Sequence, residues 1–138
     1  MRFVRQSWDI VVDAAMGWIA DEAMTRGAAI AFYTTHLGFR SLTSALPAFA
    51  DVARGDLRLL LSGPTSSGGL PLPDGRKPVP GGWNRIHLIV ENLSSEVERL
   101  RKAGLSFRSD IVTGPGGSQI VLDDPFGNPI ELFQPAKR

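Results

Sequence analysis

The stretch DDPFGNPIELFQP, Asp123 to Pro135, lies close to the C-terminus and raises a specific question. Its DP and GNP segments predict a turn, and the apolar residues that follow predict a short strand. Within that strand Glu131 stands between an isoleucine and a leucine. Such a carboxylate either belongs to the solvent face of an amphipathic strand or points into a cavity. Because successive strand residues point to opposite faces, alternation distinguishes the two.

The composition of the chain excludes several classes of function. The 138 residues, 43% hydrophobic and 21% charged, are typical of one globular domain. A net charge of +1 gives no basic field for nucleic acid. The longest apolar runs are too short to span a membrane, and the N-terminus does not resemble a secretory signal. With no cysteine, the chain fits a cytoplasmic protein and excludes disulfides and thiolate metal sites.

The second half of the chain reads as strand, helix, strand, strand, strand. The helix lies in ENLSSEVERLRKAG, where Ser95 and Glu98 have capping-box spacing and Gly104 is a stop signal. The strand RIHLIV precedes it, and LSFRSDIV, SQIVLDD and PIELFQP follow. The GPGG of residues 114–117 predicts a hairpin turn, because no helix follows it as in a phosphate-binding loop.

The first half repeats this order more loosely. AIAFYTTHLGF predicts a helix that stops at Gly38, and residues 39–46, 48–52 and DLRLLLSGP predict three strands after it. An opening strand fits residues 7–13 better than the helix-like WIADEAMTR. The parallels between HLGF and AGLSF, and between LLLSGP and ELFQP, indicate a duplicated module of about sixty residues. The segment between the copies is rich in Gly and Pro, which predicts a linker or a functional flap.

Alternation along four strands separates a purely apolar face, suited to packing under a helix, from a mixed face. The mixed face combines arginines, a histidine and a carboxylate with apolar side chains, which is more typical of a ligand cavity than of a solvated surface. Alternation therefore directs Glu131 toward a cavity. The residues of the mixed face are Arg58, Leu60, Arg85, His87, Gln119, Val121, Glu131 and Phe133.

AIAFYTTHLGF in the first half, and IVENLSSEVERLRKAGLSF followed by DDPFGNPIELFQP in the second, resemble the vicinal oxygen chelate superfamily of glyoxalases, bleomycin-resistance proteins and extradiol dioxygenases. The resemblance implies an α+β fold in which two βαβββ modules form a curved mixed sheet with helices on the outside. Within a single domain of residues 1–138, we expect a first module at 1–64, a linker at 65–82 and a second module at 83–138. It also implies a homodimer that binds a small molecule on the concave side.

In the metal-dependent members of this superfamily, the Glu before the last Leu of the closing strand is a metal ligand, and Glu131 occupies that position. Arg85 stands where those members place a histidine, and His87 lies two residues further along on the same face. In the first module the matching position falls on Arg58 or Leu60, and neither coordinates a cation. We therefore expect Glu131 to pair with Arg85, or alternatively to share a divalent metal with His87.

Three functions stay open on these residues. The first is a small-molecule binder without a full metal site, in which the surplus of cationic groups favours an anionic or carbonyl-rich ligand. The second is a metal-dependent glyoxalase-like lyase or isomerase, or a dioxygenase, with Glu131 and His87 as catalytic and metal-binding residues. The third is an interaction module, in which the arginines are solvated and His87 is structural. The ligand-binding residues expected for the first function are Arg58, Arg85, Gln119, Phe133 and Trp83.

The cofactor therefore depends on which function holds: none for the binder, a divalent metal ion for the enzyme. In the second case further ligands come from a partner subunit, from water or from the N-terminal segment. The acidic candidates in that segment are Asp9, Asp13, Asp21 and Glu22.

Overall fold

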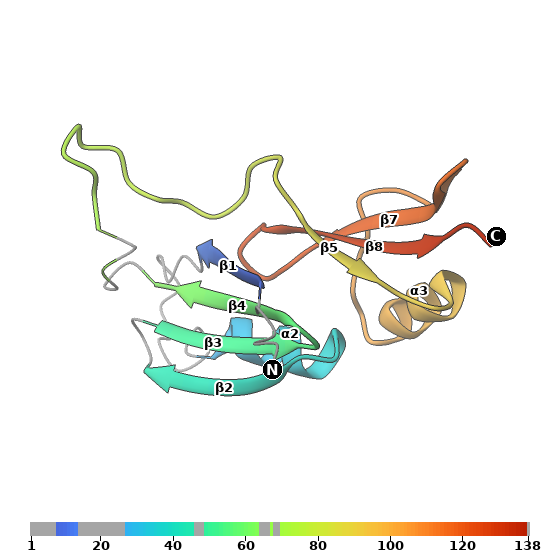
Figure 1. Cartoon of the computed structure of the whole chain (residues 1–138), viewed down its shortest axis with the longest axis horizontal. Helices are drawn as coiled ribbons and strands as arrows, with labels where there is room; N and C mark the ends of the chain where they lie inside the picture. The colour runs from blue at the N-terminus through green and yellow to red at the C-terminus, as the bar shows by residue number, and fades with distance from the viewer. Residues whose placement is uncertain (1–7, 14–26, 46–48, 64–66, 68–69, 138) are drawn as a thin grey trace, which may run out of the picture. The chain divides into compact units, whose positions relative to one another are not determined.

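A computed structural model of the chain describes residues 8–13, 27–45, 49–63, 67 and 70–137. It divides into two compact units, residues 1–80 and 81–138, and each unit has its own sheet (Figure 1). The boundary after Pro80 falls inside the segment that the sequence predicts as a linker.

In its described residues, the first unit contains a four-stranded sheet of order β1-β4-β3-β2 and the helix α2. β1 runs parallel to β4, and the other neighbours are antiparallel. β1, at Trp8–Asp13, agrees with the opening strand that the sequence predicts at residues 7–13. The elements are β1 (Trp8–Asp13), α2 (Ala28–His36), β2 (Arg40–Ala45), β3 (Phe49–Arg54) and β4 (Leu57–Ser62).

The core of the first unit lies between α2 and the sheet. Tyr33 is fully buried and meets Phe39 edge to face, with ring centroids 5.3 Å apart. On the strands, Val52 and Leu59 are fully buried beneath the helix face. α2 ends at His36, and Gly38 follows with a φ of 71°, a left-handed conformation that favours glycine.

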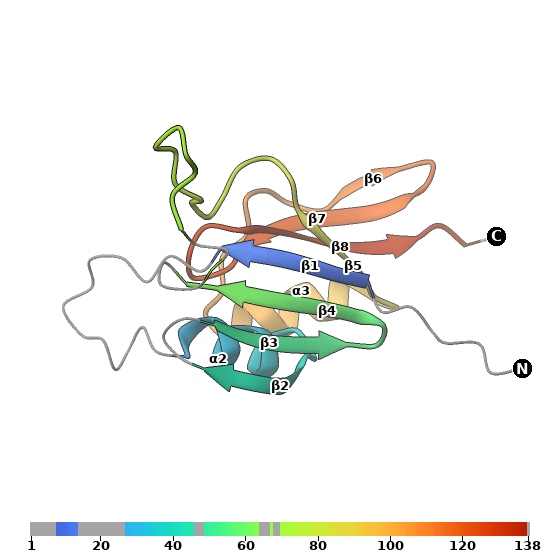
Figure 2. The ribbon, with the colours of Figure 1, turned by 60° about the vertical axis from the view of Figure 1, so that its left-hand side comes forward.

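The second unit has the same plan, with a sheet of order β5-β8-β7-β6 and the helix α3 (Figure 2). β5 is parallel to β8, and β8-β7 and β7-β6 are antiparallel. Two βαβββ modules with mixed sheets confirm the predicted α+β fold class. The elements are β5 (Ile86–Ile89), α3 (Leu93–Lys102), β6 (Val112–Gly114), β7 (Gly117–Asp123) and β8 (Pro129–Pro135).

Period-two alternation sets the core of the second unit. Burial alternates along β5 and β7, the apolar residues of β8 face the same side although Pro129 and Glu131 are buried as well, and α3 adds its own apolar stripe to this core. This arrangement confirms the apolar faces that the sequence predicts for these strands. The buried residues are Ile86, Leu88, Leu93, Val97, Leu100, Ile120, Leu122, Ile130 and Leu132.

The start of α3 corrects one sequence-based prediction. The N-cap is Asn92, whose side chain accepts a hydrogen bond from the Ser95 amide at 3.0 Å, so Ser95 and Glu98 do not form the capping box. The helix begins at Leu93 because Leu93 is buried and its amide donates to the Gln134 side chain at 2.7 Å. Packing against β8 therefore sets the first turn, three residues earlier than the local pattern indicates.

The segment between the two modules forms turns rather than regular elements. The Leu72 amide bonds to the Arg76 carbonyl at 2.7 Å, and residues 70–80 contain no helix or strand. Across the residues that the structure describes, no helix is long and apolar enough to cross a membrane.

Candidate ligand-binding site

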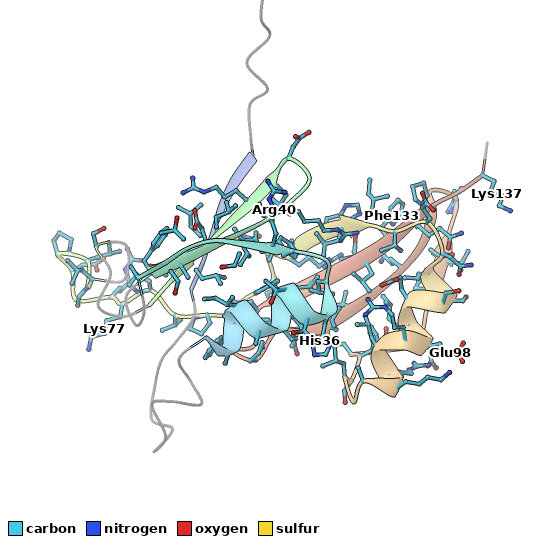
Figure 3. The ribbon with its side chains drawn as sticks, turned by 90° about the horizontal axis from the view of Figure 1, so that it is seen from below. His36, Arg40, Lys77, Glu98, Phe133 and Lys137 are labelled. Atoms are coloured by element: carbon cyan, nitrogen blue, oxygen red, sulfur yellow. The ribbon has the colours of Figure 1, made fainter. Side chains whose placement is uncertain are left out.

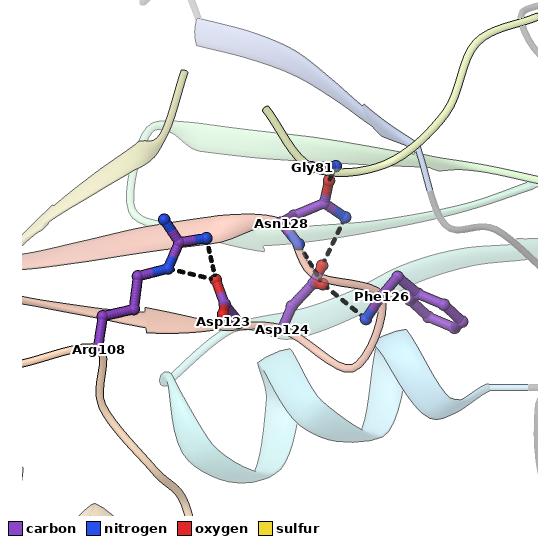
Figure 4. Close-up of polar contacts among 6 residues, drawn as sticks. All are labelled: Gly81, Arg108, Asp123, Asp124, Phe126 and Asn128. Carbon is purple, nitrogen blue, oxygen red and sulfur yellow. Dashed lines mark hydrogen bonds and ion pairs between the residues drawn. The ribbon is translucent and has the colours of Figure 1, made fainter. Parts of the chain in front are cut away.

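The turn that begins β8 is held by buried polar groups (Figure 4). Oδ1 of Asp124 accepts hydrogen bonds from the amides of Phe126 and Asn128 at 2.8 and 2.9 Å, and Oδ2 accepts from Nδ2 of Asn128 at 2.8 Å. Oδ1 of Asn128 accepts from the Gly81 amide at 2.9 Å. The DPFGN segment therefore has a structural role, because it fixes the start of β8 and ties it to the chain that leads into β5.

Glu131 lies in the middle of β8, on the sheet face turned away from α3. In register it is opposite His87 of β5 and Val121 of β7, whereas its neighbours Ile130 and Leu132 are buried in the core with α3. The Glu131 side chain is nevertheless only 7% exposed. Alternation thus predicts its direction correctly, and the carboxylate is not a solvent-facing charge.

Both oxygens of Glu131 are bound by side chains from the β5 end of the chain. Oε1 accepts from Nε of Arg85 at 3.0 Å and lies 2.9 Å from its Nη2. Oε2 lies 3.1 Å from Nε2 of His87. The side chains of Arg85 and His87 are 42% and 45% exposed, so the carboxylate is buried while its two partners remain accessible. The ion pair of Glu131 with Arg85, expected from the sequence, is confirmed.

Apolar side chains lie next to this cluster on the same face. One register row crosses the four strands through Ile89, Phe133, Gln119 and Val112. Ile89 and Val112 are exposed, Phe133 and Gln119 are half-buried, and the His87 ring lies 5.0 Å from that of Phe133. Figure 3 shows Phe133 at the end of this sheet. The face thus combines accessible N–H donors with a row in which three of four side chains are apolar, which suits a ligand with a polar head and an apolar body.

In the first unit, Arg58 lies on β4 and is bound to a carboxylate that the sequence analysis missed. Its Nε donates to Oδ2 of Asp51 at 2.8 Å, and Oδ1 of Asp51 accepts from the Thr43 amide at 2.6 Å. Asp51 is 3% exposed. Burial alone would raise the pKa of Asp51, but the hydrogen bonds from Arg58 and Thr43 and the charge of Arg58 outweigh it and lower that pKa.

Asp51 corrects the charge balance expected for the mixed face. The sequence predicts a surplus of positive charge on this face, from two arginines and a histidine with a single carboxylate. In the structure each of the two arginines pairs with a buried carboxylate of its own. The signal was present in the sequence, because Asp51 stands between Ala50 and Val52 in a strand, as Glu131 stands between two apolar residues. A ligand on either face would therefore meet individual N–H donors rather than a surplus of positive charge.

The structure brings together only part of the predicted site. Glu131, His87 and Arg85 are in direct contact, and Phe133 and Gln119 share their sheet face. Trp83 is 87% exposed, so it is not buried against this cluster. Arg58 belongs to the first unit. The side chains of the proposed acidic ligands in the N-terminal segment, Asp9, Asp13, Asp21 and Glu22, lie outside the described residues.

A divalent metal does not fit the side chains described in the second unit. A catalytic metal needs at least three N or O ligands, and no group of three His, Cys, Asp or Glu in the described part of the chain could hold one. Oε1 of Glu131 already contacts a guanidinium. A dication about 4 Å from that guanidinium would be repelled by about 8 kcal/mol at an effective dielectric constant of about 20.

Comparisons with known proteins agree with this fold. The family model of the Glyoxalase/Bleomycin resistance protein/Dioxygenase superfamily matches residues 27–132, so the chain belongs to that superfamily. No curated protein matches the sequence.

Three solved structures illustrate how widely this fold is used. A lactoylglutathione lyase from Agrobacterium tumefaciens has a TM-score of 0.68 at 16% identity, covering 91% of this chain and 90% of its own. An antibiotic binding protein from Streptomyces sp. CB03234 has a TM-score of 0.65 at 23% identity, covering 99% and 98%. A virulence protein from Salmonella typhimurium has a TM-score of 0.67 at 23% identity, covering 99% and 100%. At these identities the likeness concerns the fold alone.

Proposed function

We propose that the protein binds a small organic molecule on the sheet face around Arg85, His87 and Glu131, and that it does so without a full metal site. One observation carries this proposal: a buried carboxylate has its two oxygens occupied by two accessible nitrogen-bearing side chains. A carboxylate bound in this way orients its partners instead of presenting itself to solvent.

Recognition of the ligand follows from the chemistry of Arg85. A guanidinium has five N–H donors in a planar fork, and Glu131 engages two of its nitrogens. The accessible part of the group can donate to carboxylate or carbonyl oxygens. Phe133 and Gln119 in the adjacent row would contact the body of the ligand. The ligand class is therefore an anionic or carbonyl-rich molecule with an apolar portion. The antibiotic binding protein with the same fold supports a binding role.

The proposal is tested by calorimetric titration of the full chain with a panel of aryl carboxylates, 2-oxo acids and glutathione adducts. We expect at least one class to bind and Arg85→Gln to weaken it by at least about tenfold, the effect of losing one charged hydrogen bond. Arg108→Gln is the matched control, because Arg108 also pairs with a carboxylate of the same unit, Asp123, at 2.9 Å. Equal binding by wild type and Arg85→Gln would contradict the assignment of the ligand to Arg85. No binding by either would contradict the proposal as a whole and favour an interaction module.

The alternative is a metal-dependent lyase, isomerase or dioxygenase. It is supported by the 3.1 Å approach of His87 to Glu131 and by the lactoylglutathione lyase of the same fold. In that case the two side chains would be ligands in a set completed from outside the described residues. Metal analysis of protein purified without chelators separates the functions: one bound metal per chain, lost in Glu131→Gln, would establish the alternative.

Two further expectations belong with this proposal. The superfamily resemblance favours a homodimer, which light scattering on the purified chain tests through its molar mass. The absence of cysteine fits a cytoplasmic protein. Fractionation of the cells that make it would test that location.

A further inference from the structure

We infer that the Arg85 guanidinium takes the position of a metal ion in this site and excludes divalent metals from Glu131 and His87. A single substitution at position 85 would then create a metal site. This makes Arg85 a specificity-determining residue, because it sets whether the face binds ligand oxygens through N–H donors or through a metal. The inference rests on the proposed function, in which the same cluster binds the ligand without a metal.

The contacts of Glu131 carry the first step. A metal ligand must direct an oxygen lone pair at the ion, and Oε1 is engaged by both Nε and Nη2 of Arg85 at 3.0 and 2.9 Å. Oε2 lies 3.1 Å from Nε2 of His87, the nitrogen that would itself have to face the metal. A divalent ion at the same oxygen would lie within contact distance of the guanidinium and be repelled by it. Arg85 therefore occupies the place that an ion would need.

The positions of the three residues carry the second step. Arg85 directly precedes β5 and lies two residues before His87, so alternation directs both side chains to the same face. His87 is opposite Glu131 in register and lies against its Oε2, and Arg85, two residues earlier on the same flank of β8, contacts Oε1. A histidine at position 85 would therefore lie two residues before His87 on the same sheet face, diagonal to Glu131 across the β5–β8 pair. Two imidazoles and one carboxylate are a common ligand set for divalent transition metals.

The test is a titration of the full chain with Co²⁺, followed by visible absorption and by calorimetry. Wild type should show no stoichiometric binding, whereas Arg85→His should bind one ion per chain at least about tenfold more tightly, because even partners that only hydrogen-bond to metal ligands change metal affinity by about 10–100-fold. Adding Glu131→Gln to Arg85→His should abolish the gain. Arg108→His is the matched control, because it places a histidine beside Asp123 without a second imidazole.

Several outcomes would overturn the inference. One is Glu131-dependent, stoichiometric binding of Co²⁺ by wild type, since Arg85 would then not exclude the ion. Another is an Arg85→His variant that keeps the wild-type circular dichroism but binds no more tightly than wild type. If Arg85→His does not fold, Arg85→Gln takes its place, and it should gain weak Co²⁺ binding that Glu131→Gln removes. No gain in a folded Arg85→Gln variant would also overturn the inference.

The two experiments distinguish failure of the inference from failure of the proposed function. Failure of wild type to bind any carboxylate or carbonyl ligand would remove the proposed function while leaving the Co²⁺ comparison between wild type and Arg85→His unaffected. Conversely, a wild type that binds the organic ligand through Arg85, together with an Arg85→His variant that gains no metal, would keep the proposed function and refute the inference.

Discussion

At the scale of single residues, two buried carboxylates are each held by an arginine on the face turned away from their own helix. Glu131 lies on the last strand of its module and is bound by Arg85, and Asp51 lies on the third strand and is bound by Arg58. Asp51 of β3 is opposite Leu60 of β4 in register. In the second module, Val121 of β7 is likewise opposite Glu131 of β8, so there the acid lies on the closing strand. Each module therefore has one arginine–carboxylate pair, but the arginine and the acid come from different strands in the two modules.

Removal of the Glu131 charge tests how much this cluster stabilises the fold. Glu131→Gln keeps the size of the side chain but weakens two charge-assisted contacts, so we expect a loss of about 1–2 kcal/mol in the free energy of unfolding. Urea denaturation at neutral pH measures it. Asp123→Asn is the control, because the Arg108–Asp123 pair is exposed and should contribute less than about 1 kcal/mol. Equal losses in the two variants would show that burial of Glu131 adds nothing.

Asp51 predicts a pH dependence of stability with a definite sign. Its native pKa is lowered from the ordinary value of 3.8, so the native state binds fewer protons than the unfolded state as the pH falls. Its stabilisation is fully present above that ordinary value and is lost as the pH drops through the lower native pKa. Asp51→Asn should lose about 2 kcal/mol at neutral pH and show a flatter acid limb, measured by urea denaturation between pH 7 and about pH 3. An unchanged acid limb would contradict the assignment.

At the scale of elements, the β6–β7 hairpin depends on one glycine. Gly117 has a φ of 146°, and a Cβ at this position would overlap the Gln134 carbonyl oxygen on β8. We expect Gly117→Ala to destabilise the protein by at least about 2 kcal/mol, because the overlap is with backbone that cannot move without breaking the ladder. Gly116→Ala is the matched control, since a Cβ there meets nothing within 4 Å. Thermal unfolding compares the two, and equal melting temperatures would refute the prediction.

The start of α3 shows where local sequence patterns stop being sufficient. Ser95 and Glu98 match a capping box, but Asn92 caps the helix because tertiary packing buries Leu93. Asn92→Ala should therefore cost about 1 kcal/mol, whereas Ser95→Ala should change stability by less than about 0.5 kcal/mol. Chemical denaturation of both variants measures the difference, and the reverse order would restore the capping box at Ser95.

At the scale of the whole molecule, strict alternation predicted the strand faces, and the DPFGNPIELF segment predicted the superfamily. Both patterns lie within short stretches of sequence, so they can be recognised without knowing which strands are neighbours in the sheet. The partner of Arg58 could not be predicted in this way, because it depends on the register between β3 and β4. The net charge of a sheet face likewise depends on side chains from several strands, so it cannot be obtained from one strand alone. An acid inside an apolar strand, as at Asp51, is the part of that signal that the sequence does contain.

The division into two units predicts where proteolysis can cut the chain without disrupting either sheet. Every strand pair of the described residues lies within one unit, and the side chain of Arg76, in the segment between the modules, is 78% exposed. Trypsin should therefore cut first after Arg76 among the described residues, since Pro78 protects the bond after Lys77. Mass spectrometry locates the cut, and far-UV circular dichroism should be retained because no ladder hydrogen bond is lost. Arg76→Gln should delay the cut. A first cut after Arg99 or Arg101 in α3, or loss of the strand signal on cutting at Arg76, would contradict this division.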